Sequence, residues 1–269
     1  MASVTAFSGN VPVNYETYLG PLFFEPYAID LVNRLGENKP RQMVLEIACG
    51  TGRVTKHLDS YLPQEATLVA TDLNSEMLNV AKQVVKNYRV KWQVADVHEL
   101  PFEEAQFDLV VCQFGVMFFQ DKPKALKEIR RVLQPGGTFL FNTWDDLQYN
   151  ALSRLTKDVL TEEYPDDPPL FLEKGPYSLT NPDEIKQLLA DAGFTSISIE
   201  LVSKTGEVPT AREAVNGIID GTPNYVYITE RGIPASVVKE KLTALLTDHF
   251  GDKKLSLPMQ AFVAEARKP

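Results

Sequence analysis

The stretch that decides the fold is VLEIACGTGRVT, residues 44–55. It begins as an apolar run of the kind that forms a buried strand, and it ends in a turn that contains Gly50 and Gly52. Glycines after a strand let the backbone approach a ligand, and the N–H groups that open the next helix attract anionic groups. Glu46 interrupts the apolar run, and a buried carboxylate is costly unless it has a partner. The sequence therefore predicts a ligand site directly after this strand.

Working outward, apolar runs alternate with helical patterns over residues 41–143. The expected strands are 43–48, 67–71, 90–95, 107–113 and 138–143. The clearest helical patterns are 75–87 and 121–133, the second ended by Pro135-Gly136-Gly137. Alternating strands and helices predict an α/β fold with a doubly wound, mostly parallel sheet that has helices on both faces.

After Thr143 the pattern changes. Residues 144–180 read as irregular and proline-rich, and a helix follows in which Asn181 is the cap and Gly193 the end. Strands are expected at 195–203 and 257–266, and two helical patterns at 208–254, the second starting at Pro234. The inserts 144–180 and 208–254 leave from strand ends, where ligands bind in open α/β sheets. A substrate lid and simple packing both fit these inserts.

Two carboxylates close later strands of the predicted sheet. Asp72 ends the second strand, about 20 residues after the glycine turn, where a carboxylate binds ribose hydroxyls. Asp96 ends the third strand, where an adenine would lie. NAD and S-adenosylmethionine both fit Asp72. The glycine pattern separates them, because Thr55 stands where the dinucleotide fingerprint has its third glycine, and the pattern here is E-x-x-x-G-x-G.

With these residues the chain resembles the class I S-adenosylmethionine-dependent methyltransferases, and most closely the group that includes the ubiquinone and menaquinone biosynthesis C-methyltransferases. Five stretches within about residues 41–143 carry the resemblance: VLEIACGTGRVT, TDLNSEML, ADVHELPF, FDLVVCQFGVMFFQD and LKEIRRVLQPGGTFLF. The resemblance implies a Rossmann-like sheet of seven strands, the last of them antiparallel, with S-adenosyl-L-methionine as cofactor.

The resemblance also assigns roles to residues. Glu46 orients the glycine turn and reaches the methionine end directly or through water, Asp72 holds the ribose, and Asp96 holds the adenine amino group. Tyr15 and Tyr18 belong to an aromatic N-terminal helix that either folds over the sulfonium or serves as packing. The implied cofactor-binding residues are Glu46, Ala48, Cys49, Gly50, Thr51, Gly52, Asp72, Leu73, Met77, Asp96, Val97, Gln113, Phe114, Tyr15 and Tyr18. The expected substrate pocket contains Met117, Phe118 and Trp144.

The domain organisation expected is one methyltransferase domain over 1–269. It comprises an N-terminal helical cap at 1–40, a cofactor-binding core at 41–143, and the two inserts as a substrate lid.

Composition limits the partners. A formal net charge of −9 argues against a nucleic-acid partner, which normally needs a basic surface. Cys49 and Cys112 have no neighbours at metal-ligand spacing, so no metal is expected. The N-terminal ten residues lack a signal-peptide pattern and no apolar run is long enough to span a membrane, which predicts a cytoplasmic protein. The oligomeric state, monomer or homodimer, stays open.

The predicted function is methyl transfer to a small-molecule acceptor by in-line displacement, the activity class EC 2.1.1.-. The sequence identifies neither the acceptor, nor the methylated atom (O, N, C or S), nor a general base. His57 fits a helix surface better than a catalytic role. Two alternatives remain: a catalytically silent S-adenosylmethionine-binding module, and an NAD-dependent dehydrogenase, which Thr55 and Glu46 disfavour.

Overall fold

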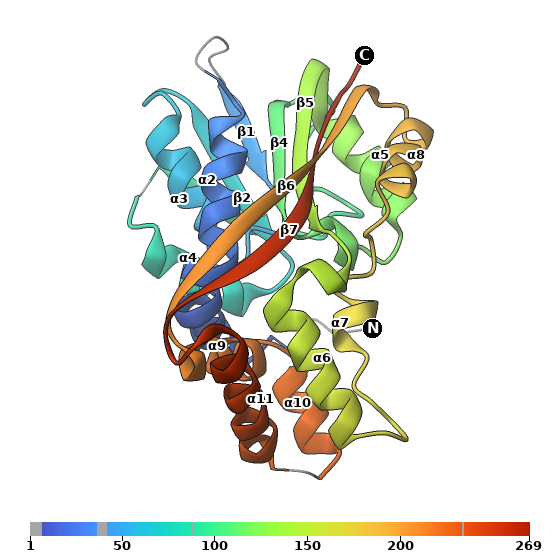
Figure 1. Cartoon of the computed structure of the whole chain (residues 1–269). Coiled ribbons are helices and arrows are strands. Elements are labelled where there is room, and N and C mark those ends of the chain that lie inside the picture. Colours follow the sequence, from blue (N-terminus) through green and yellow to red (C-terminus); the bar gives the residue numbers. More distant parts are fainter. Residues whose placement is uncertain (1–6, 37–41, 88, 233) are drawn as a thin grey trace.

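A seven-stranded mixed sheet forms the centre of the protein, whose computed structural model describes residues 7–36, 42–87, 89–232 and 234–269 (Figure 1). The strand order is β3-β2-β1-β4-β5-β7-β6. The strands are β1 (Met43–Glu46), β2 (Thr67–Asp72), β3 (Val90–Val94), β4 (Phe107–Gln113), β5 (Leu133–Trp144), β6 (Thr195–Thr210) and β7 (Lys253–Arg267). Strands β1 to β5 pair in parallel, and β7 pairs antiparallel with both β5 and β6. The predicted doubly wound, Rossmann-like fold is therefore confirmed.

The strand order reverses at β1, whose neighbours are β2 on one side and β4 on the other. At such a switch point the chain leaves adjacent strands toward opposite faces, which opens a crevice at their carboxyl ends. The last residues of β1, β2 and β4 are Glu46, Asp72 and Gln113. The topology therefore brings the two predicted acidic residues and Gln113 to one edge of the sheet.

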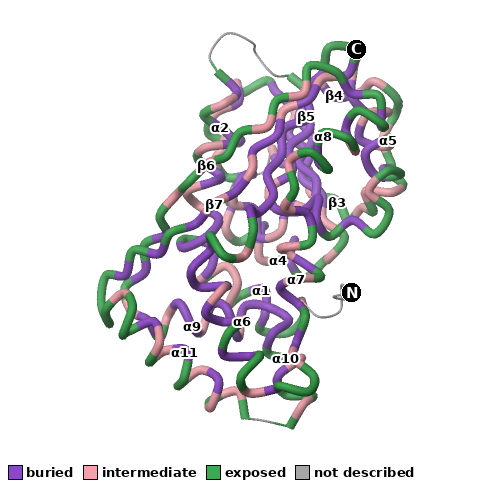
Figure 2. The backbone as a smooth tube through the Cα atoms, turned by 45° about the vertical axis from the view of Figure 1, so that its right-hand side comes forward, coloured by how far each residue is buried: buried purple, intermediate pink, exposed green. Residues whose placement is uncertain are grey.

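Helices cover both faces of the sheet, which agrees with the mostly apolar sequence and the burial of its central strands. The helices around it are α2 (Glu25–Asn33), α3 (Arg53–Tyr61), α4 (Ser75–Val84), α5 (Lys122–Val132) and α8 (Pro182–Asp191). Buried side chains of α2, α3 and α4 pack with the strands in one core, whereas α5 and α8 contribute to the other. Figure 2 shows the central strands as buried backbone.

A second, helical region lies at the opposite end of the molecule from the C-terminus (Figure 1). It contains α1 (Val11–Asn14), the π-helix η2 (Tyr15–Phe24), α6 (Ala151–Glu163), α7 (Phe171–Lys174), α9 (Ala211–Asp220), α10 (Asn224–Glu230) and α11 (Ala235–Phe250). The short 3-10 turns are η3 (Val116–Phe118) and η4 (Leu147–Tyr149). We call this whole helical region the cap; it contains α1 and η2 from the N-terminal helical cap predicted at 1–40, together with helices of both inserts. The antiparallel pair β6–β7 runs from the sheet into it, pairing from Thr195 with Arg267 as far as Thr210 with Lys253.

The π-helix η2 is packed unusually closely because its neighbours are glycines. A Cβ added at Gly217 of α9 would stand 2.8 Å from Leu19 Cδ2, and one at Gly206 of β6 would stand 2.4 Å from the carbonyl oxygen of Leu22. A Cβ at Gly221, after α9, would stand 2.9 Å from the backbone nitrogen of Tyr15. Long π-helices are rare and concentrate at functional sites. Here the wide turn is held against both α9 and the β6 edge strand.

Several boundaries differ from the sequence prediction. The expectation that 144–180 is irregular is wrong, because α6 occupies thirteen of its residues. The second insert contains three helices, not two. The sequence predicts that Pro135-Gly136-Gly137 precede the fifth strand, but β5 already begins at Leu133. These three residues therefore lie inside the strand, where its pairing with β4 shifts register. Strands β6 and β7 extend past their apolar patterns because each pairs with the other beyond the sheet.

Some predictions fall outside the described residues. Residues 1–6, which belong to the segment considered for a signal peptide, are not described. Residues 37–40 of the predicted N-terminal helical cap and residue 41, where the predicted core begins, are not described either. Within the described residues, no helix combines the length and apolarity needed to cross a lipid bilayer.

Candidate functional site

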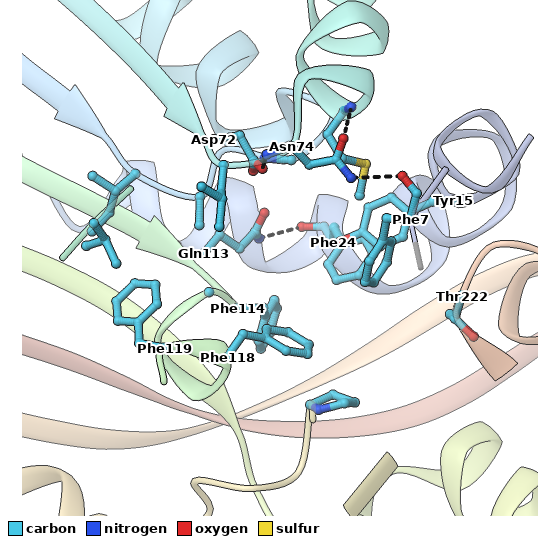
Figure 3. Close-up of a pocket in the computed structure, with 18 of the residues that line it drawn as sticks. Phe7, Tyr15, Phe24, Asp72, Asn74, Gln113, Phe114, Phe118, Phe119 and Thr222 are labelled. Atoms are coloured by element: carbon cyan, nitrogen blue, oxygen red, sulfur yellow. Dashed lines mark hydrogen bonds between the residues drawn. The ribbon is translucent and has the colours of Figure 1, made fainter. Parts of the chain in front are cut away.

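A cavity of about 360 Å³ opens at the carboxyl ends of β1, β2, β3 and β4, between the sheet and the cap (Figure 3). Its walls come from the turns after these strands, from η2, and from the two inserts. Pockets of this size at a switch point are the usual ligand sites of open α/β sheets. One end of the cavity is polar and the other is aromatic, and we describe these as the turn side and the aromatic side.

Asp72 is the central polar group of the turn side. Its Oδ2 accepts a hydrogen bond from the Gly50 N–H (2.8 Å) and its Oδ1 accepts one from the Asn74 N–H (2.8 Å). Burial raises the pKa of Asp72, although the N–H groups of Asn74, Gly50 and Leu73 oppose the shift. Each oxygen keeps a lone pair for a further donor. The carboxylate thus ties the first turn to the second and still faces the cavity.

Asn74 continues this construction into α4. Its Oδ1 accepts hydrogen bonds from the N–H groups of Glu76 (2.8 Å) and Met77 (3.3 Å), so it caps the helix. Its Nδ2 donates to the carbonyl of Phe7 (2.8 Å), which places the N-terminal segment at the cavity rim. The turn after β2 is therefore fixed on both sides.

The turns after β1 and β4 contain backbone strain. Ala48 and Phe114 both have a φ of 49°, which is uncommon for residues other than glycine. Asn142, on the adjacent strand β5, accepts the Phe114 N–H at its Oδ1 (2.9 Å). A Cβ at the following residue, Gly115, would stand 2.7 Å from Ala48 Cβ, so the two turns touch. Strained residues of this kind concentrate at ligand sites.

Asp96 and His98 form the part of the turn side after β3. The Asp96 Oδ1 accepts hydrogen bonds from the His98 N–H (2.9 Å) and from His98 Nδ1 (2.6 Å). Partial burial opposes ionisation, but these His98 contacts outweigh it and lower the pKa of Asp96. His98 Nε2 accepts the Asp121 N–H (3.3 Å), which assigns the proton to Nδ1. Both ring nitrogens of His98 are therefore engaged.

The aromatic side is formed by rings from distant segments. Phe114 and Trp144 stack with ring centroids 3.8 Å apart and planes 8° from parallel. Where the two sides meet, Tyr15 stacks on Phe24 with centroids 4.7 Å apart, and burial, together with the charge of Asp72 on the turn side, raises the pKa of Tyr15. The Tyr177 hydroxyl donates to Ser153 Oγ (2.8 Å), and burial raises the pKa of Tyr177. Among the described residues that line the cavity, the only carboxylates are those of the turn side, and no lysine or arginine is present.

Most of the predicted site residues lie on the cavity wall. Those that line it are Tyr15, Ala48, Gly50, Asp72, Leu73, Met77, Asp96, Val97, Gln113, Phe114, Phe118 and Trp144. Gln113 also donates from Nε2 to the carbonyl of Phe24 (2.9 Å), which joins β4 to η2. Six predicted residues do not line the cavity: Glu46, Cys49, Thr51, Gly52, Tyr18 and Met117. Their contacts with a ligand stay predictions that the packing does not favour.

The side chain of Glu46 lies beneath the glycine turn. It is 1% exposed, and its Oε2 accepts a hydrogen bond from Thr55 Oγ1 on α3 (2.6 Å). Burial, together with the charge of Asp72, raises the pKa of Glu46 to about 8, although Thr55 opposes the shift. Glu46 thus supports α3 from below, and Thr55 is its partner at the position where a dinucleotide fingerprint has glycine.

Tyr18 and Thr51 have partners away from the cavity. A Cβ at Gly217 would stand 2.9 Å from Tyr18 Cβ, so Tyr18 packs against α9. Thr51 donates from Oγ1 to Glu16 Oε2 (2.6 Å). The sequence prediction did not distinguish Tyr15 from Tyr18, because a π-helix turns its residues through a different angle from the α-helix that the pattern assumes.

Sequence reasoning missed several lining residues. They include Phe7, Leu19, Phe23, Phe24, Asn74, His98, Ser153, Phe171, Tyr177, Ile218 and Thr222. The aromatic composition of 14–27 is a signal for Phe23 and Phe24. Ser153 and Tyr177 lie in the insert that reads as irregular, and the sequence has no signal that pairs them.

The geometry fits the cofactor predicted from the sequence. Gly50, with a φ of 55°, lines the cavity, and a Cβ built there meets no atom within 4 Å, so its backbone borders open space. Leu73 is 48% exposed although it is apolar and lines the same wall. Asp72 offers two acceptors for adjacent hydroxyls, and Leu73, Met77 and Val97 offer an apolar surface for a base.

Comparisons with known proteins support the predicted family and cofactor. Residues 45–141 match a family model described as a methyltransferase domain. The chain is 28% identical over 172 residues to the ubiquinone/menaquinone biosynthesis C-methyltransferase UbiE of Escherichia coli O1:K1, covering 58% of this chain and 67% of the relative.

Two solved structures extend the comparison to the fold. Phosphoethanolamine N-methyltransferase 2 of Haemonchus contortus with S-adenosyl-L-methionine has a TM-score of 0.64 at 22% identity, covering 100% of this chain and 60% of that one. The [4+2]-cyclase SpnF has a TM-score of 0.55 at 16% identity, covering 91% of this chain and 81% of that one. The second shows that this fold alone does not determine the reaction.

Proposed function

Given that this chain is an S-adenosylmethionine-dependent methyltransferase of class I, we propose that it methylates a small, uncharged and largely apolar acceptor. The observation that carries this proposal is the division of one continuous cavity. The turn side has the carboxylates that suit the cofactor. The aromatic side, which remains for the acceptor, is lined by rings and by the hydroxyls of Ser153, Tyr177 and Thr222.

A charged acceptor finds no counterion on the aromatic side. A phosphate or carboxylate group is normally held by arginine or lysine, and the described lining has neither. The solved relative from Haemonchus contortus is named for phosphoethanolamine, whose phosphate is anionic. We therefore infer that this chain acts on a different acceptor class, although it shares that fold.

Each wall has its own task in the proposed reaction. When bound, S-adenosylmethionine supplies a methyl group activated by the sulfonium. Asp72 holds the ribose hydroxyls and Asp96 the adenine, while the Phe114–Trp144 stack aligns a flat acceptor for in-line displacement. Alignment of two reactants is itself a large part of the rate enhancement that such a site gives.

Among the described residues that line the aromatic side, none is suited to act as a general base. The raised pKa of Tyr177 keeps its hydroxyl protonated, and His98 has both nitrogens engaged. We infer that the acceptor is already a competent nucleophile near neutral pH, such as an acidic hydroxyl, an activated carbon, a thiol or a neutral amine. Tyr177 and Ser153 then orient it through a hydrogen bond and do not remove its proton.

We also propose that the two inserts act as the substrate lid and that the protein is cytoplasmic. Residues of both inserts line the cavity, among them Tyr177 and Thr222. Cys49 and Cys112 are both free thiols and both buried, which suits a reducing compartment. The net charge of −9 favours a metabolite over a nucleic acid.

The test uses S-adenosylmethionine labelled on its methyl group and a desalted metabolite extract. Purified protein is incubated with both, beside an Asp72→Ala control, and label is counted in organic, aqueous and macromolecular fractions. Label in the organic fraction that is absent in the control supports the proposal. Label in the macromolecular precipitate, or only in a strongly anionic product, contradicts it. No transfer, with S-adenosylhomocysteine still bound, would favour a silent binding module and also contradicts it.

A further inference from the structure

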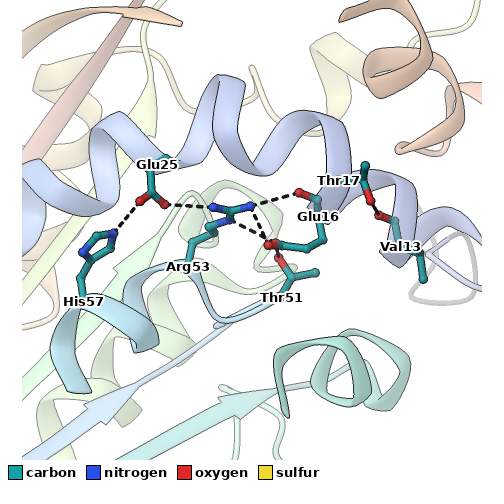
Figure 4. Close-up of polar contacts among 7 residues, drawn as sticks. All are labelled: Val13, Glu16, Thr17, Glu25, Thr51, Arg53 and His57. Carbon is teal, nitrogen blue, oxygen red and sulfur yellow. Dashed lines mark hydrogen bonds and ion pairs between the residues drawn. The ribbon is translucent and has the colours of Figure 1, made fainter. Parts of the chain in front are cut away.

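Arg53 lies at the start of α3, directly after the glycine turn, and binds two carboxylates of the N-terminal helices (Figure 4). Its guanidinium contacts both oxygens of Glu16, with Nη2 2.6 Å from Oε1 and Nε 3.2 Å from Oε2. Nη2 also donates to the Glu16 carbonyl (3.1 Å), and Nη1 donates to Glu25 Oε2 (3.1 Å). This forked arrangement is the strong, geometrically specific form of an arginine–carboxylate contact.

The surroundings complete a closed network. Thr51, in the glycine turn itself, donates from Oγ1 to Glu16 Oε2 (2.6 Å). His57 Nε2 lies 3.0 Å from Glu25 Oε1. Burial opposes ionisation of Glu25, but Arg53 and His57 outweigh it and hold its pKa below the usual range. The side chains of Arg53 and Glu16 are each only 15% exposed, so solvent screens this pair weakly.

Gly20 makes the arrangement possible. It lies inside η2, and a Cβ added there would stand 2.4 Å from Arg53 Nη2. Glycine inside a helix ordinarily lowers its stability. Here the missing side chain provides the space that the guanidinium occupies, which links the composition of η2 to the position of Arg53.

The network joins two walls of the turn side of the cavity. The glycine turn provides Gly50, and η2 provides Tyr15 and Phe24, which stack on each other and line the same cavity. Arg53 and Thr51 are not on the cavity wall themselves, so they act through the elements that they connect.

We propose that Arg53 is a positioning residue for methyl transfer, which clamps η2 to the glycine turn and so holds Tyr15 and Phe24 over the bound cofactor. Without the clamp, the cofactor has to order η2 as it binds, and its affinity falls by that cost. The inference concerns the cofactor alone, so it does not depend on the identity of the acceptor.

Arg34 provides a matched control. It too is an arginine between two carboxylates, with Nε 2.6 Å from Asp30 Oδ2 and Nη1 2.9 Å from Glu200 Oε2. It joins α2 to β6, and none of these three residues lines the cavity. Loss of this contact should affect stability without affecting the cofactor site.

The experiment measures S-adenosylhomocysteine binding by calorimetry for Arg53→Ala, Arg34→Ala and the unaltered protein. It also measures hydrogen exchange over residues 15–24 with and without that ligand. We expect Arg53→Ala to weaken binding by about tenfold and to lose the ligand-induced protection of this segment. Arg34→Ala should keep both. Equal binding and equal protection in the two variants would overturn the proposal.

Two further variants keep the test decisive if Arg53→Ala does not fold. Arg53→Lys restores one ion pair but not the fork, so it should give intermediate affinity. Gly20→Ala leaves Arg53 present and displaces its guanidinium, so it should weaken binding in the same direction. A folded Gly20→Ala protein with unchanged affinity and unchanged exchange over 15–24 would contradict the clamp.

Discussion

The two sides of the cavity are built in different ways. The turn side comes from short turns after β1, β2, β3 and β4, within residues 47–115. The aromatic side gathers rings and hydroxyls from segments as far apart as Phe23 and Thr222. A turn after a buried strand is specified by the few residues that form it, whereas a wall made of several helices depends on how those helices pack. The first kind of site is therefore encoded locally, and the second is not.

The two sides also differ in how their backbone is held. Asp72, Asn74 and Asn142 each hold backbone N–H groups of the turn side through hydrogen bonds of 2.8–3.3 Å. On the aromatic side hydroxyl groups make the corresponding contacts: Tyr177 donates to Ser153, and Thr222 donates to the Ile218 carbonyl and accepts the Asn224 N–H. We expect the turn side to tolerate little change, and the aromatic side to accept changes that alter the acceptor. The following experiments test that contrast, from the largest expected effect to the smallest.

Asp72→Ala should weaken S-adenosylhomocysteine binding by about a hundredfold or more, because it removes both the proposed ribose acceptor and two bonds that hold the turns. Calorimetry measures the loss. Asp121→Ala is the control, since Asp121 also accepts a backbone N–H, that of Lys124 (2.9 Å), but does not line the cavity. Similar affinities for the two variants would remove the basis for treating the turn side as the cofactor site.

Glu46→Gln should raise stability progressively between pH 5 and pH 8. The pKa of Glu46 is about 8 in the folded protein and 4.5 in the unfolded chain, so folding favours the protonated side chain. The stability that protonated Glu46 contributes is fully present below pH 4.5 and is lost as pH rises through 8. Glutamine keeps an acceptor for Thr55 and does not ionise. The gain should be on the order of 1 kcal/mol per pH unit in this window, measured by urea unfolding. A gain that does not vary with pH would show that the Glu46 pKa is not raised.

Glu46→Gln also tests whether the Glu46 carboxylate contacts the cofactor. Because Glu46 lies beneath the turn and not on the cavity wall, Glu46→Gln should bind S-adenosylhomocysteine within about twofold of the unaltered protein at pH 5. A much larger loss would mean that the carboxylate contacts the cofactor, as the sequence resemblance implies.

Gly217→Ala should destabilise the protein by about 1–3 kcal/mol, although glycine to alanine in a helix normally stabilises. The added methyl would stand 2.8 Å from Leu19 Cδ2 and 2.9 Å from Tyr18 Cβ, so η2 has to move. Thermal unfolding measures the effect, with the exposed Arg212→Ala on the same helix as control. A stabilised Gly217→Ala protein would show that the contact between α9 and η2 is loose.

Tyr177→Phe should have the smallest effect, about 1 kcal/mol of stability, because one buried hydrogen bond to Ser153 is lost. We expect unchanged S-adenosylhomocysteine affinity and a raised KM for the acceptor found in the labelling experiment. Leu179, which is buried and does not line the cavity, provides a control as Leu179→Val. Weaker cofactor binding in Tyr177→Phe alone would contradict the separation of the two sides.

The sequence predicts the turn side well because its residues follow a repeated local pattern. Asp72 and Asp96 end apolar runs, and parallel strands bring such ends to one edge. The alternation that reveals the strands also fixes their order to within a few topologies. The role of Asn74 as the N-cap of Ser75–Val84 can likewise be predicted from the sequence.

The aromatic side and the Arg53 clamp cannot be predicted from the sequence in the same way. Arg53 and Glu16 are 37 residues apart, and nothing in either neighbourhood pairs them. The π-helix changes which residues of 15–24 face the cavity, so a pattern with an α-helical period cannot separate Tyr15 from Tyr18. Ser153 lies on α6, which the sequence pattern groups with the proline-rich stretch that follows it, so no helix is predicted there. These features depend on tertiary packing, which overrides local preference.

The position of β7 has a consequence for the order in which the protein can be assembled. This strand, near the C-terminal end, lies between β5 and β6, so β5 keeps an unpaired edge until residues 253–267 have been synthesised. Pairings such as Thr138 with Arg267 join distant parts of the chain, and such contacts form slowly and expose strand edges meanwhile. The same strand extends into the cap. We expect nascent chains that stop before Lys253 to aggregate, and the aromatic side of the cavity to be among the last parts of the protein to form.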